Sequence, residues 1–393
     1  MRWKSLYLFF ILFYSFNLHV SISAQPINAE KLNALLKRAE ETHSEAVIIF
    51  KEGKLVSESY YGIGNSNRVI ESMSCTKSIV GLAVACLISD NLIDSLRTPV
   101  YKFYPEWNQG SKKRITIEHL VNMTSGIQNE MRATEEIYPS PDFVQLALSA
   151  ELTSSPGTVW SYNNKALNLL AGLVKKITGK RMDDYIAARL FEPLEIKEFK
   201  WTLDSVGNPH VMSGCQLKPL DFAKIGLLLL NKGEYMARRV IAEDAINILL
   251  TPCNLFEGYA GLWWLDYENT KSIVDDSCIR KLRDANLEKQ FMEKVEKMKG
   301  EYFSDKEYFS KIDEVFGANP WEYINAQLGE NLRIRRREYS GRISYRADGY
   351  LGNYIIVDPA SNIVAIRMIS WESCSSEEDF FSDFKSMVLD LRN

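Results

Sequence analysis

The sequence predicts a mixed α/β fold of the α+β type, in which an antiparallel sheet built from both chain ends is flanked by helices. Two observations support this: short apolar strands joined by tight turns occur near both ends, and the section between them is mainly helical. Such strand pairs bury their apolar faces best by joining one sheet covered by helices. With 393 residues, 46% of them hydrophobic, the chain can form a sizeable core.

The first 24 residues have the pattern of a secretory signal peptide. Arg2 and Lys4 form a basic start, and an apolar run over 6–16 follows. Small residues then lead to a cleavage point near Ala24. The apolar run is short for a membrane span, so an uncleaved anchor is the lesser alternative. We therefore expect an exported mature chain, residues 25–393, in a periplasm or outside the cell.

The elements that predict the sheet and its helices follow in chain order. At the N-terminal end we expect an amphipathic helix and two strands, over 29–42, 46–50 and 55–61. In the middle section we expect helices that include 166–178 and 221–231. At the C-terminal end we expect two strands and a final helix, over 354–357, 363–366 and 377–391.

A charge-rich segment, 277–337, stands apart from these elements. Its apolar residues recur at helical spacing, at Ile279, Leu282, Phe291, Val295 and Met298. We interpret it as a charged helical insertion at about 270–340, near the mouth of the active site. A surface insertion solvated on one side, a lid and a partner-binding arm are the possible roles.

Ser74 and Lys77 lie three residues apart at the start of a predicted buried helix. Ser74-Cys75-Thr76-Lys77 is followed by an apolar run over 78–88 that is too long for a strand. Residues three apart share one helical face, so the hydroxyl and the amine stack one turn apart. A helix N-terminus favours developing negative charge, and burial favours the neutral, basic form of a lysine. The pattern predicts a hydroxyl nucleophile with its own base.

Ser-x-x-Lys alone is a weak signal. A second copy, Ser382-Asp383-Phe384-Lys385, lies in the predicted C-terminal helix with nothing catalytic after it. The alternative for Ser74 is a helix-capping serine, and for Lys77 a solvated lysine. The assignment therefore depends on further motifs.

A second motif, Trp160-Ser161-Tyr162-Asn163-Asn164, opens the predicted helix over 166–178. Tyr162 can pass a proton between a serine, a lysine and a leaving group if nearby positive charge lowers its pKa. Asn164 can offer its amide to Lys77 and to a substrate carbonyl. The alternative is a turn tyrosine with a capping asparagine.

A third motif, Arg-Ala-Asp-Gly-Tyr-Leu-Gly-Asn at 346–353, precedes a predicted strand. Glycine at such a position lets the backbone approach a substrate closely, and Gly349 is placed to do so. The N–H of Tyr350, paired with that of Ser74, would form an oxyanion hole. The alternative is a plain glycine turn into a strand.

In this order the three motifs resemble those of the serine β-lactamase and penicillin-recognising enzyme family, in its class C branch. That branch includes esterases, D-aminopeptidases, DD-peptidases and nylon-oligomer hydrolases. Further matches are Leu-Val-Asn-Met-Thr-Ser-Gly at 120–126, Pro-Gly at 156–157 and Phe-Glu-Pro-Leu at 191–194. The resemblance covers nearly the whole mature chain. It implies a β-lactamase/DD-peptidase-like fold, with an all-helical subdomain beside the sheet.

The resemblance also implies roles for individual residues. Ser74 matches the acylated nucleophile, Lys77 its base partner and Tyr162 the proton-shuttling tyrosine. Asn164 matches the substrate-binding asparagine of the Tyr-x-Asn motif. The backbone at Gly349 and Tyr350 matches the second oxyanion donor.

The third motif departs from the β-lactamase pattern. Those enzymes carry Lys-Thr-Gly or His-x-Gly, whose cation helps to hold the β-lactam carboxylate. Here the triplet is Ala347-Asp348-Gly349, so a charge-assisted contact is lost, unless Arg342 or Arg346 replaces it. An Ala-x-Gly triplet is similar to the esterase and nylon-oligomer hydrolase side of the family. Efficient β-lactamase activity is not expected.

We expect hydrolysis of a small-molecule or peptide-like amide or ester through an acyl-enzyme. Whether Lys77 or Tyr162 is the acylation base stays open. A penicillin-binding DD-peptidase or β-lactamase is the alternative within the family, and a non-turnover acyl-binding or sensor module is the alternative outside enzymes. A Ser-His-Asp hydrolase is disfavoured, because the chain has no Gly-x-Ser-x-Gly elbow and the mature part has only His43, His119 and His210.

Composition and charge limit the classes of binding partner that the sequence predicts. A net charge of −4 gives no indication of a nucleic-acid surface, and no Cys-x-x-Cys or His-Glu-x-x-His spacing suggests a metal. No cofactor and no stable membrane insertion after signal cleavage are expected.

The six cysteines permit disulfides, but Cys75 and Cys86 lie too far apart on one helix to pair. Trp263 and Trp264 either wall an apolar pocket or fill the core. The oligomeric state stays open.

Overall fold

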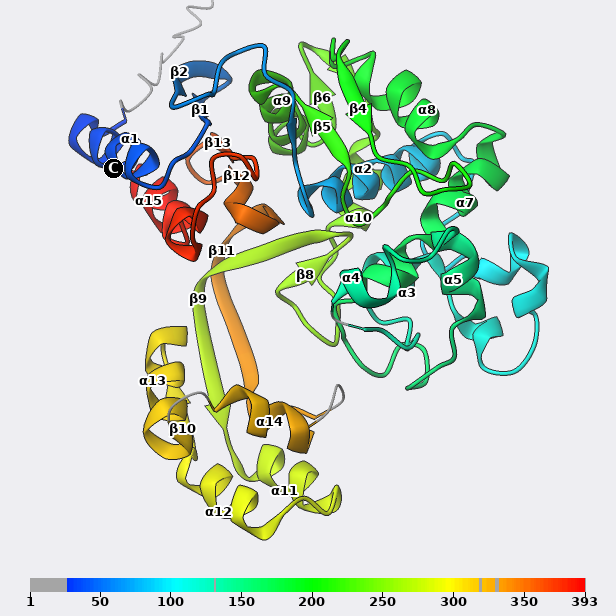
Figure 1. Cartoon of the computed structure of the whole chain (residues 1–393), viewed down its shortest axis with the longest axis vertical. Coiled ribbons are helices and arrows are strands. Elements are labelled where there is room, and N and C mark those ends of the chain that lie inside the picture. The colour runs from blue at the N-terminus through cyan, green and yellow to red at the C-terminus, as the bar shows by residue number, and fades with distance from the viewer. Residues whose placement is uncertain (1–26, 131, 318–319, 329–331, 393) are drawn as a thin grey trace, which may run out of the picture.

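The computed structural model describes residues 27–130, 132–317, 320–328 and 332–392, and it confirms the predicted antiparallel sheet with helices on both sides (Figure 1). The predicted signal peptide lies outside the described residues. The main sheet has eight strands in the order β10-β9-β11-β12-β13-β1-β2, and β8 pairs with β9. The strands are β1 Ala46–Lys51, β2 Lys54–Tyr60, β8 Tyr259–Ala260, β9 Trp263–Val274, β10 Gly300–Tyr302, β11 Arg336–Gly349, β12 Asn353–Asp358 and β13 Ile363–Met368.

Strands from both ends of the chain meet inside this sheet, as the sequence predicts. In the antiparallel register, Ile48 of β1 lies opposite Ile366 of β13 on one side and Glu58 of β2 on the other. β1 is apolar almost throughout because both of its faces are buried. Val47 and Ile49 pack under α1 and α15, whereas alternate residues such as Ile48 join the central core.

Helices form a layer on each face of the sheet (Figure 1). α1 (Ala29–Glu41) and α15 (Phe384–Asp390) cover one face, and α9 (Pro219–Leu230) packs on β12 and β13 from the other. The prediction of one continuous helix over 377–391 is wrong. A 3₁₀ turn, η6 (Glu377–Phe380), is separated from α15 by residues 381–383, and the first of them, Phe381, has a left-handed φ of 49°. This break lets the Phe381 ring enter the core beside Phe384, with ring centroids 5.2 Å apart.

The middle section is mainly helical, and it also carries two short antiparallel sheets, β3-β5-β4 and β6-β7. The predicted helix over 166–178 is split at Asn168. The helices are α2 Cys75–Ser89, α3 Ile117–Val121, α4 Ala133–Glu136, α5 Phe143–Ser149, α6 Asn164–Leu167, α7 Leu169–Thr178, α8 Met182–Ile186 and α10 Glu243–Leu249. The short strands are β3 Ile70–Glu71, β4 Phe199–Trp201, β5 Cys215–Leu217, β6 Glu234–Tyr235 and β7 Arg238–Arg239.

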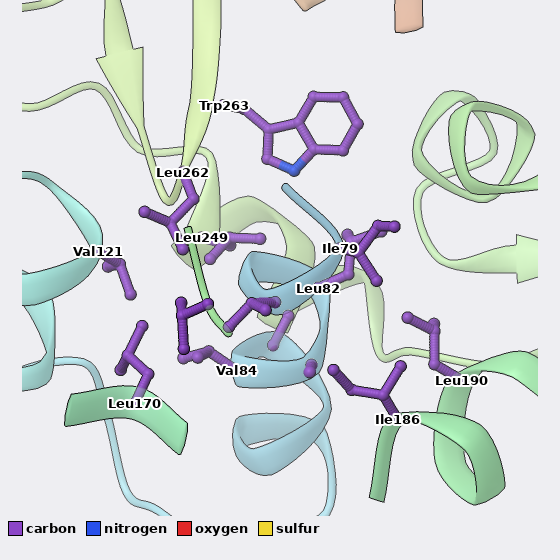
Figure 2. Packing of buried hydrophobic residues seen from close by; sticks show 14 of the residues in the cluster. Ile79, Leu82, Val84, Val121, Leu170, Ile186, Leu190, Leu249, Leu262 and Trp263 are labelled. Carbon is purple, nitrogen blue, oxygen red and sulfur yellow. The ribbon is translucent and has the colours of Figure 1, made fainter. Parts of the chain in front are cut away.

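Helix α2 runs through the centre of the core. Figure 2 shows apolar side chains on both flanks of this helix and above it, and every residue from Cys75 to Leu87 is buried. A Cβ atom on Gly81 would lie 2.3 Å from the carbonyl oxygen of Gly261, so only glycine permits this close packing. Ser78 Oγ also donates a hydrogen bond of 2.7 Å to the Leu262 carbonyl. These contacts fix α2, and therefore its N-terminus, against the start of β9.

Residues 276–334, which we name the insertion lobe, lie at the far end of the long hairpin formed by β9 and β11 (Figure 1). The lobe contains α11 Asp276–Asp284, α12 Lys289–Lys297, β10, α13 Asp305–Phe316 and α14 Trp321–Leu328. The five apolar residues that predicted its helices all join one separate hydrophobic core. The sequence analysis did not predict β9 and β11, because their charged residues obscure the strand pattern.

Candidate active site

Ser74 and Lys77 lie at the N-terminus of α2 in direct contact. Lys77 Nζ is 2.8 Å from Ser74 Oγ and 2.7 Å from the carbonyl oxygen of Met212. The Lys77 side chain is only 2% exposed. Burial lowers the pKa of Lys77 from its ordinary 10.5 to about 7. A substantial fraction of the amine is therefore neutral near pH 7 and able to take a proton from Ser74.

The backbone before α2 is held by contacts to both sheets. Ser72 Oγ donates to the carbonyl of Cys215 in β5 at 2.9 Å, and Cys75 Sγ donates to the carbonyl of Asn353 in β12 at 3.2 Å. Met73, directly before the candidate nucleophile, has a left-handed φ of 50°. Such a conformation is costly for a side chain larger than glycine and persists where surrounding structure enforces it.

Tyr162 faces Ser74 and Lys77 from the loop before α6. Its hydroxyl is in hydrogen-bonding contact with Ser74. Lys77 Nζ lies 5.1 Å from the centre of the Tyr162 ring, and the ring stacks on Trp264 at 6.1 Å. Burial raises the pKa of Tyr162 to about 12, although the contact with Ser74 lowers it. The sequence analysis required a lowered pKa for proton transfer, whereas in the free protein the phenol stays protonated at neutral pH.

The loop that carries Tyr162 rests on the segment over 120–126. Ser161 N–H donates to the Met123 carbonyl at 2.9 Å, and Asn129 Nδ2 donates to the Tyr162 carbonyl at 3.2 Å. The segment matched in the sequence thus supports the position of the tyrosine rather than contributing a reacting group.

Asn163 and Asn164 have different roles. Asn163 caps α6 by accepting from the N–H of Ala166 at 2.8 Å, and its amide donates to the Ile127 carbonyl at 2.7 Å. Asn164 Oδ1 is buried and has no hydrogen-bond partner among the described residues. Buried polar atoms are seldom left unpaired, so Asn164 is the residue of the pair that remains available to a ligand.

Gly349 brings the end of β11 against the start of α2. A Cβ atom on Gly349 would lie 2.6 Å from the carbonyl oxygen of Ser72 and 3.2 Å from Cys75 Sγ. This close approach brings the residue before Tyr350 against Ser72 and Cys75, which lie on either side of Ser74 in the sequence. No hydrogen bond to another described residue occupies the N–H of Ser74 or of Tyr350.

Exposed aromatic rings lie beside these backbone groups. The Tyr350 side chain is 54% exposed and contacts Trp371, itself 62% exposed, at a centroid distance of 5.3 Å. Phe380 supports Tyr350 from another side, also at 5.3 Å. Leu351, directly after Tyr350, has a left-handed φ of 66°, so a strained residue adjoins each of the two N–H groups. Trp371 is absent from the sequence analysis, because no motif marks it.

Neither arginine near the third motif is a free cation that could replace the β-lactamase lysine. Ala347 is fully buried. Arg346 binds Asp266 at 2.9 Å and also pairs with Asp348, and Arg342 binds Glu268 at 2.9 Å. Both candidate replacements are therefore neutralised by carboxylates.

Of the two roles predicted for Trp263 and Trp264, filling the core and walling a pocket, each tryptophan has a different one. Trp263 is fully buried in the central core, whereas Trp264 forms part of an aromatic wall with Tyr162 and Trp160. The second Ser-x-x-Lys motif is not a comparable site, because Ser382 is exposed and Lys385 binds Asp266 at 3.1 Å.

The described histidines do not form a Ser-His-Asp site, because none of their rings hydrogen-bonds to a serine hydroxyl. His43 pairs with Asp379, His119 Nδ1 accepts from the N–H of Thr116, and His210 packs on Phe143. All six cysteines are free. In the described parts of the chain, no helix is long and apolar enough to cross a membrane, and no group of three or more potential metal-ligating residues occurs.

Comparison with known proteins adds independent information. The family profile named Beta-lactamase matches residues 32–241. The 6-aminohexanoate-dimer hydrolase of Paenarthrobacter ureafaciens is 24% identical over 241 residues, which cover 56% of this chain and 61% of that protein. The putative penicillin-binding protein PbpX of Bacillus subtilis is 25% identical over 157 residues, 38% of this chain and 39% of that protein. The matches to the first curated relatives span 39% to 61% of their lengths.

Solved structures share the fold over a longer range. A putative 6-aminohexanoate-dimer hydrolase from Bacillus anthracis superposes with a TM-score of 0.63 at 18% sequence identity, covering 92% of this chain and 81% of the other. At this identity the likeness shows the β-lactamase/penicillin-binding-protein-like fold alone. Because the family profile matches more than half of the sequence, the chain belongs to the beta-lactamase family of serine hydrolases.

Proposed function

We propose that this chain is an exported serine hydrolase that cleaves an amide or ester through an acyl-enzyme on Ser74. The observation that carries the proposal is the buried amine of Lys77, 2.8 Å from Ser74 Oγ and with its pKa lowered to about 7. A hydroxyl becomes a useful nucleophile near neutral pH when such a base lies within hydrogen-bonding reach.

Lys77 is the base for acylation in this mechanism. Its pKa is near the pH at which a base is both deprotonated and able to hold a proton, whereas burial keeps Tyr162 protonated until about pH 12. As Ser74 Oγ attacks the carbonyl carbon, its proton passes to Lys77. Tyr162 then donates its phenolic proton to the leaving group and recovers a proton from Lys77. Water attacks the acyl-enzyme by the reverse route and releases the acid.

The N–H groups of Ser74 and Tyr350 stabilise the negative charge on the tetrahedral intermediate. Both lack an acceptor among the described residues, and the close packing of Gly349 on Ser72 and Cys75, the neighbours of Ser74, supports their pairing. Preorganised donors of this kind contribute a large part of acyl-transfer catalysis. The buried, unpaired Oδ1 of Asn164 supports a role for this side chain in orienting the substrate or the amine of Lys77.

The substrate is an amide or ester other than a β-lactam. Arg346 and Arg342 are each bound to carboxylates, so the carboxylate of a β-lactam finds no free cation at the third motif. The exposed rings of Tyr350 and Trp371 instead offer an apolar surface next to the oxyanion donors.

Intact-protein mass spectrometry tests the proposal. The mature protein is mixed with p-nitrophenyl acetate, a fluorescent penicillin or a D-alanyl-D-alanine peptide, with the Ser74→Ala variant as the control. We expect release of p-nitrophenol with turnover, a transient acetyl adduct on Ser74, and no penicillin hydrolysis. Equal turnover by Ser74→Ala would refute the nucleophile. A stable penicillin adduct or a single acylation without turnover would replace the proposal by a penicillin-binding or sensor role.

A further inference from the structure

The turn that carries the second candidate oxyanion donor has an unusual backbone. This turn, η5 (Tyr350–Gly352), joins β11 to β12. Leu351, at its centre, has a left-handed φ of 66°, and its buried side chain packs with Met73, the residue directly before Ser74. A residue other than glycine keeps such a conformation only where its surroundings enforce it. The contacts of this turn are therefore those that hold Tyr350 in place.

Asn353, the first residue of β12, holds the carbonyl of Tyr350. Its Nδ2 donates to the carbonyls of Tyr350 and Ile369, each at 3.0 Å, and its Oδ1 accepts from the N–H of Ile369 at 3.0 Å. The backbone carbonyl of Asn353 accepts from the thiol of Cys75, the residue directly after Ser74, at 3.2 Å. Asn353 thus contacts both the turn and the start of α2.

Arg367 of β13 holds the next two carbonyls of the turn. Its Nη1 donates to the carbonyl of Leu351 at 3.0 Å and to that of Gly352 at 2.8 Å. Position 352 requires glycine, because its φ is 84° and a Cβ atom there would lie 2.5 Å from Arg367 Nη1. Together with Asn353, the arginine supplies each of three consecutive carbonyls with a buried donor.

The other N–H groups of Arg367 bind the surrounding core. Nε donates to Ser44 Oγ at 2.7 Å, and Nη2 donates to the carbonyls of Thr42 at 2.8 Å and Asp379 at 2.5 Å. All five N–H groups of the guanidinium are therefore paired, and none of these acceptors is a carboxylate. Burying a cation against neutral oxygens costs free energy, so an apolar side chain would fill this place at lower cost. The geometry of the guanidinium accounts for its presence.

Holding these carbonyls also holds the N–H of Tyr350. The N–H and the carbonyl of one residue are related by only two soft torsion angles. On one side of Tyr350, Gly349 lies opposite Asn353 in the ladder between β11 and β12. On the other side, Asn353 fixes the carbonyl of Tyr350. Because both of its peptide groups are held, the N–H of Tyr350 keeps one direction.

We propose that Arg367 and Asn353 are positioning residues for the oxyanion hole, which hold the carbonyls of η5 so that the N–H of Tyr350 stays aimed at the developing negative charge. Both side chains are fully buried and act through the backbone. This role in catalysis rests on the proposed hydrolase function, whereas the hold on the turn does not. A donor is most effective when it is preorganised, so loss of the hold should lower kcat rather than substrate binding.

Two conservative variants and a matched control test this role. Arg367→Lys keeps the charge but offers three donors in place of the five of the guanidinium, and Asn353→Asp keeps the size but loses the amide donors. The control is Ile363→Ala, which truncates a fully buried side chain on the same strand as Arg367, in the part of the core under α1 and α15. Urea denaturation measures how much each change destabilises the protein.

Hydrolysis of p-nitrophenyl acetate gives the kinetic readout. We expect kcat of Arg367→Lys and of Asn353→Asp to fall by about 10², the order of the loss of one oxyanion donor, with KM changed less than about twofold. Ile363→Ala should be destabilised as well and keep the kcat of the wild-type protein. Wild-type kcat in a variant that folds, or an equal loss of kcat in the control, would overturn the role.

Phenylboronic acid gives a readout specific to the oxyanion hole. Its tetrahedral adduct with a serine hydroxyl carries an oxygen at the position of the oxyanion and so imitates the transition state. Its affinity for the two variants should fall by about the same factor as kcat/KM, and its affinity for Ile363→Ala should not change. Undiminished affinity in both variants would overturn the inference.

Crystal structures of the three variants separate the hold on the turn from the proposed hydrolysis. In Arg367→Lys and Asn353→Asp we expect the peptide between Gly349 and Tyr350 to rotate, and in Ile363→Ala we expect no change there. This readout needs no turnover, so it decides the inference even if the wild-type protein hydrolyses no ester, a result that would refute the proposed function instead. An unchanged turn over 350–352 in both variants would overturn the inference, even if hydrolysis by the wild-type protein depends on Ser74.

Discussion

Replacing Lys77 by methionine separates the catalytic value of its amine from the stability cost of burying it. Burial lowers the pKa of Lys77 from 10.5 to about 7. One pKa unit corresponds to about 1.4 kcal/mol, so protonating this amine costs roughly 5 kcal/mol more in the folded protein than in the unfolded chain. Methionine has a similar length and no charge, and it therefore removes this penalty.

The sign of the effect depends on pH. The pKa of Lys77 is lower in the folded than in the unfolded chain, so between about pH 7 and pH 10.5 the unfolded chain binds more protons and the stability of the wild-type protein rises with pH. Below pH 7 the full penalty is present. The variant loses hydrogen bonds to Ser74 and to the Met212 carbonyl, each worth about 1 kcal/mol. We expect a net stabilisation of roughly 2–3 kcal/mol below pH 7 that shrinks as the pH rises and turns into a destabilisation of about 2 kcal/mol above pH 10.5, where only the loss of the two hydrogen bonds remains.

Urea denaturation of both proteins, well below and well above pH 7, measures this difference, and ester hydrolysis measures activity. Activity of Lys77→Met should fall by a factor of 10² to 10⁴, roughly the contribution of a general base. In the wild-type protein, kcat/KM should decline as the pH falls below about 7, because protonation removes the base. A variant that is less stable than the wild type at every pH, together with a wild-type kcat/KM that does not change across pH 7, would refute the reasoning.

The remaining predictions concern the tyrosine, the glycine at the end of β11 and the insertion lobe. Tyr162→Phe should lower kcat by roughly 10² to 10⁴ with little change in stability, because it removes only the phenolic proton donor; a normal rate with a poor leaving group would contradict this role. Gly349→Ala should lower kcat/KM at least tenfold and reduce the melting temperature, since its Cβ would lie 2.6 Å from the Ser72 carbonyl; an unchanged rate would show that this close approach does not matter. Replacing 276–334 by an Asn-Gly turn should leave a folded protein that still hydrolyses p-nitrophenyl acetate, because the lobe has its own core; circular dichroism and release of p-nitrophenol check this, and an unfolded product would show that the lobe supports the main sheet.

Local sequence was sufficient for the central features of the fold. The apolar runs of β1, β12 and β13 identify strands because both faces of these strands are buried. The run after Ser74 identifies α2 for the same reason. The spacing of Ser74 and Lys77 fixes their contact, since three residues make almost one turn of a helix.

Features that depend on distant contacts were not accessible in this way. Phe381 interrupts the predicted C-terminal helix because its ring packs in the core, which no local propensity reveals. The strands β9 and β11 carry charges that pair across the hairpin, such as Arg346 with Asp266, so they lack an apolar pattern. The Met212 carbonyl contributes to the site through its backbone, which no side-chain motif records.

Tyr162 shows how a resemblance supplements such reasoning. Nothing in its own segment places it beside Ser74, and only the order of the motifs suggested that it belongs there. Its raised pKa, about 12, follows from burial behind Trp264 and depends on the assembled fold. The sequence could therefore name the residue, whereas its protonation state required the structure.

The pairing of β1 with β13 has a consequence for when this protein can fold. These strands come from opposite ends of the described chain, and β1 cannot take its central place until β13 has been synthesised. The same holds for Gly349, which packs against Ser72 and Cys75 but follows them by most of the chain. Contacts of such long sequence separation form slowly, since the intervening loop must close first. An emerging chain should therefore remain inert and unfolded until its synthesis is almost finished, a delay that favours transport across a membrane before folding.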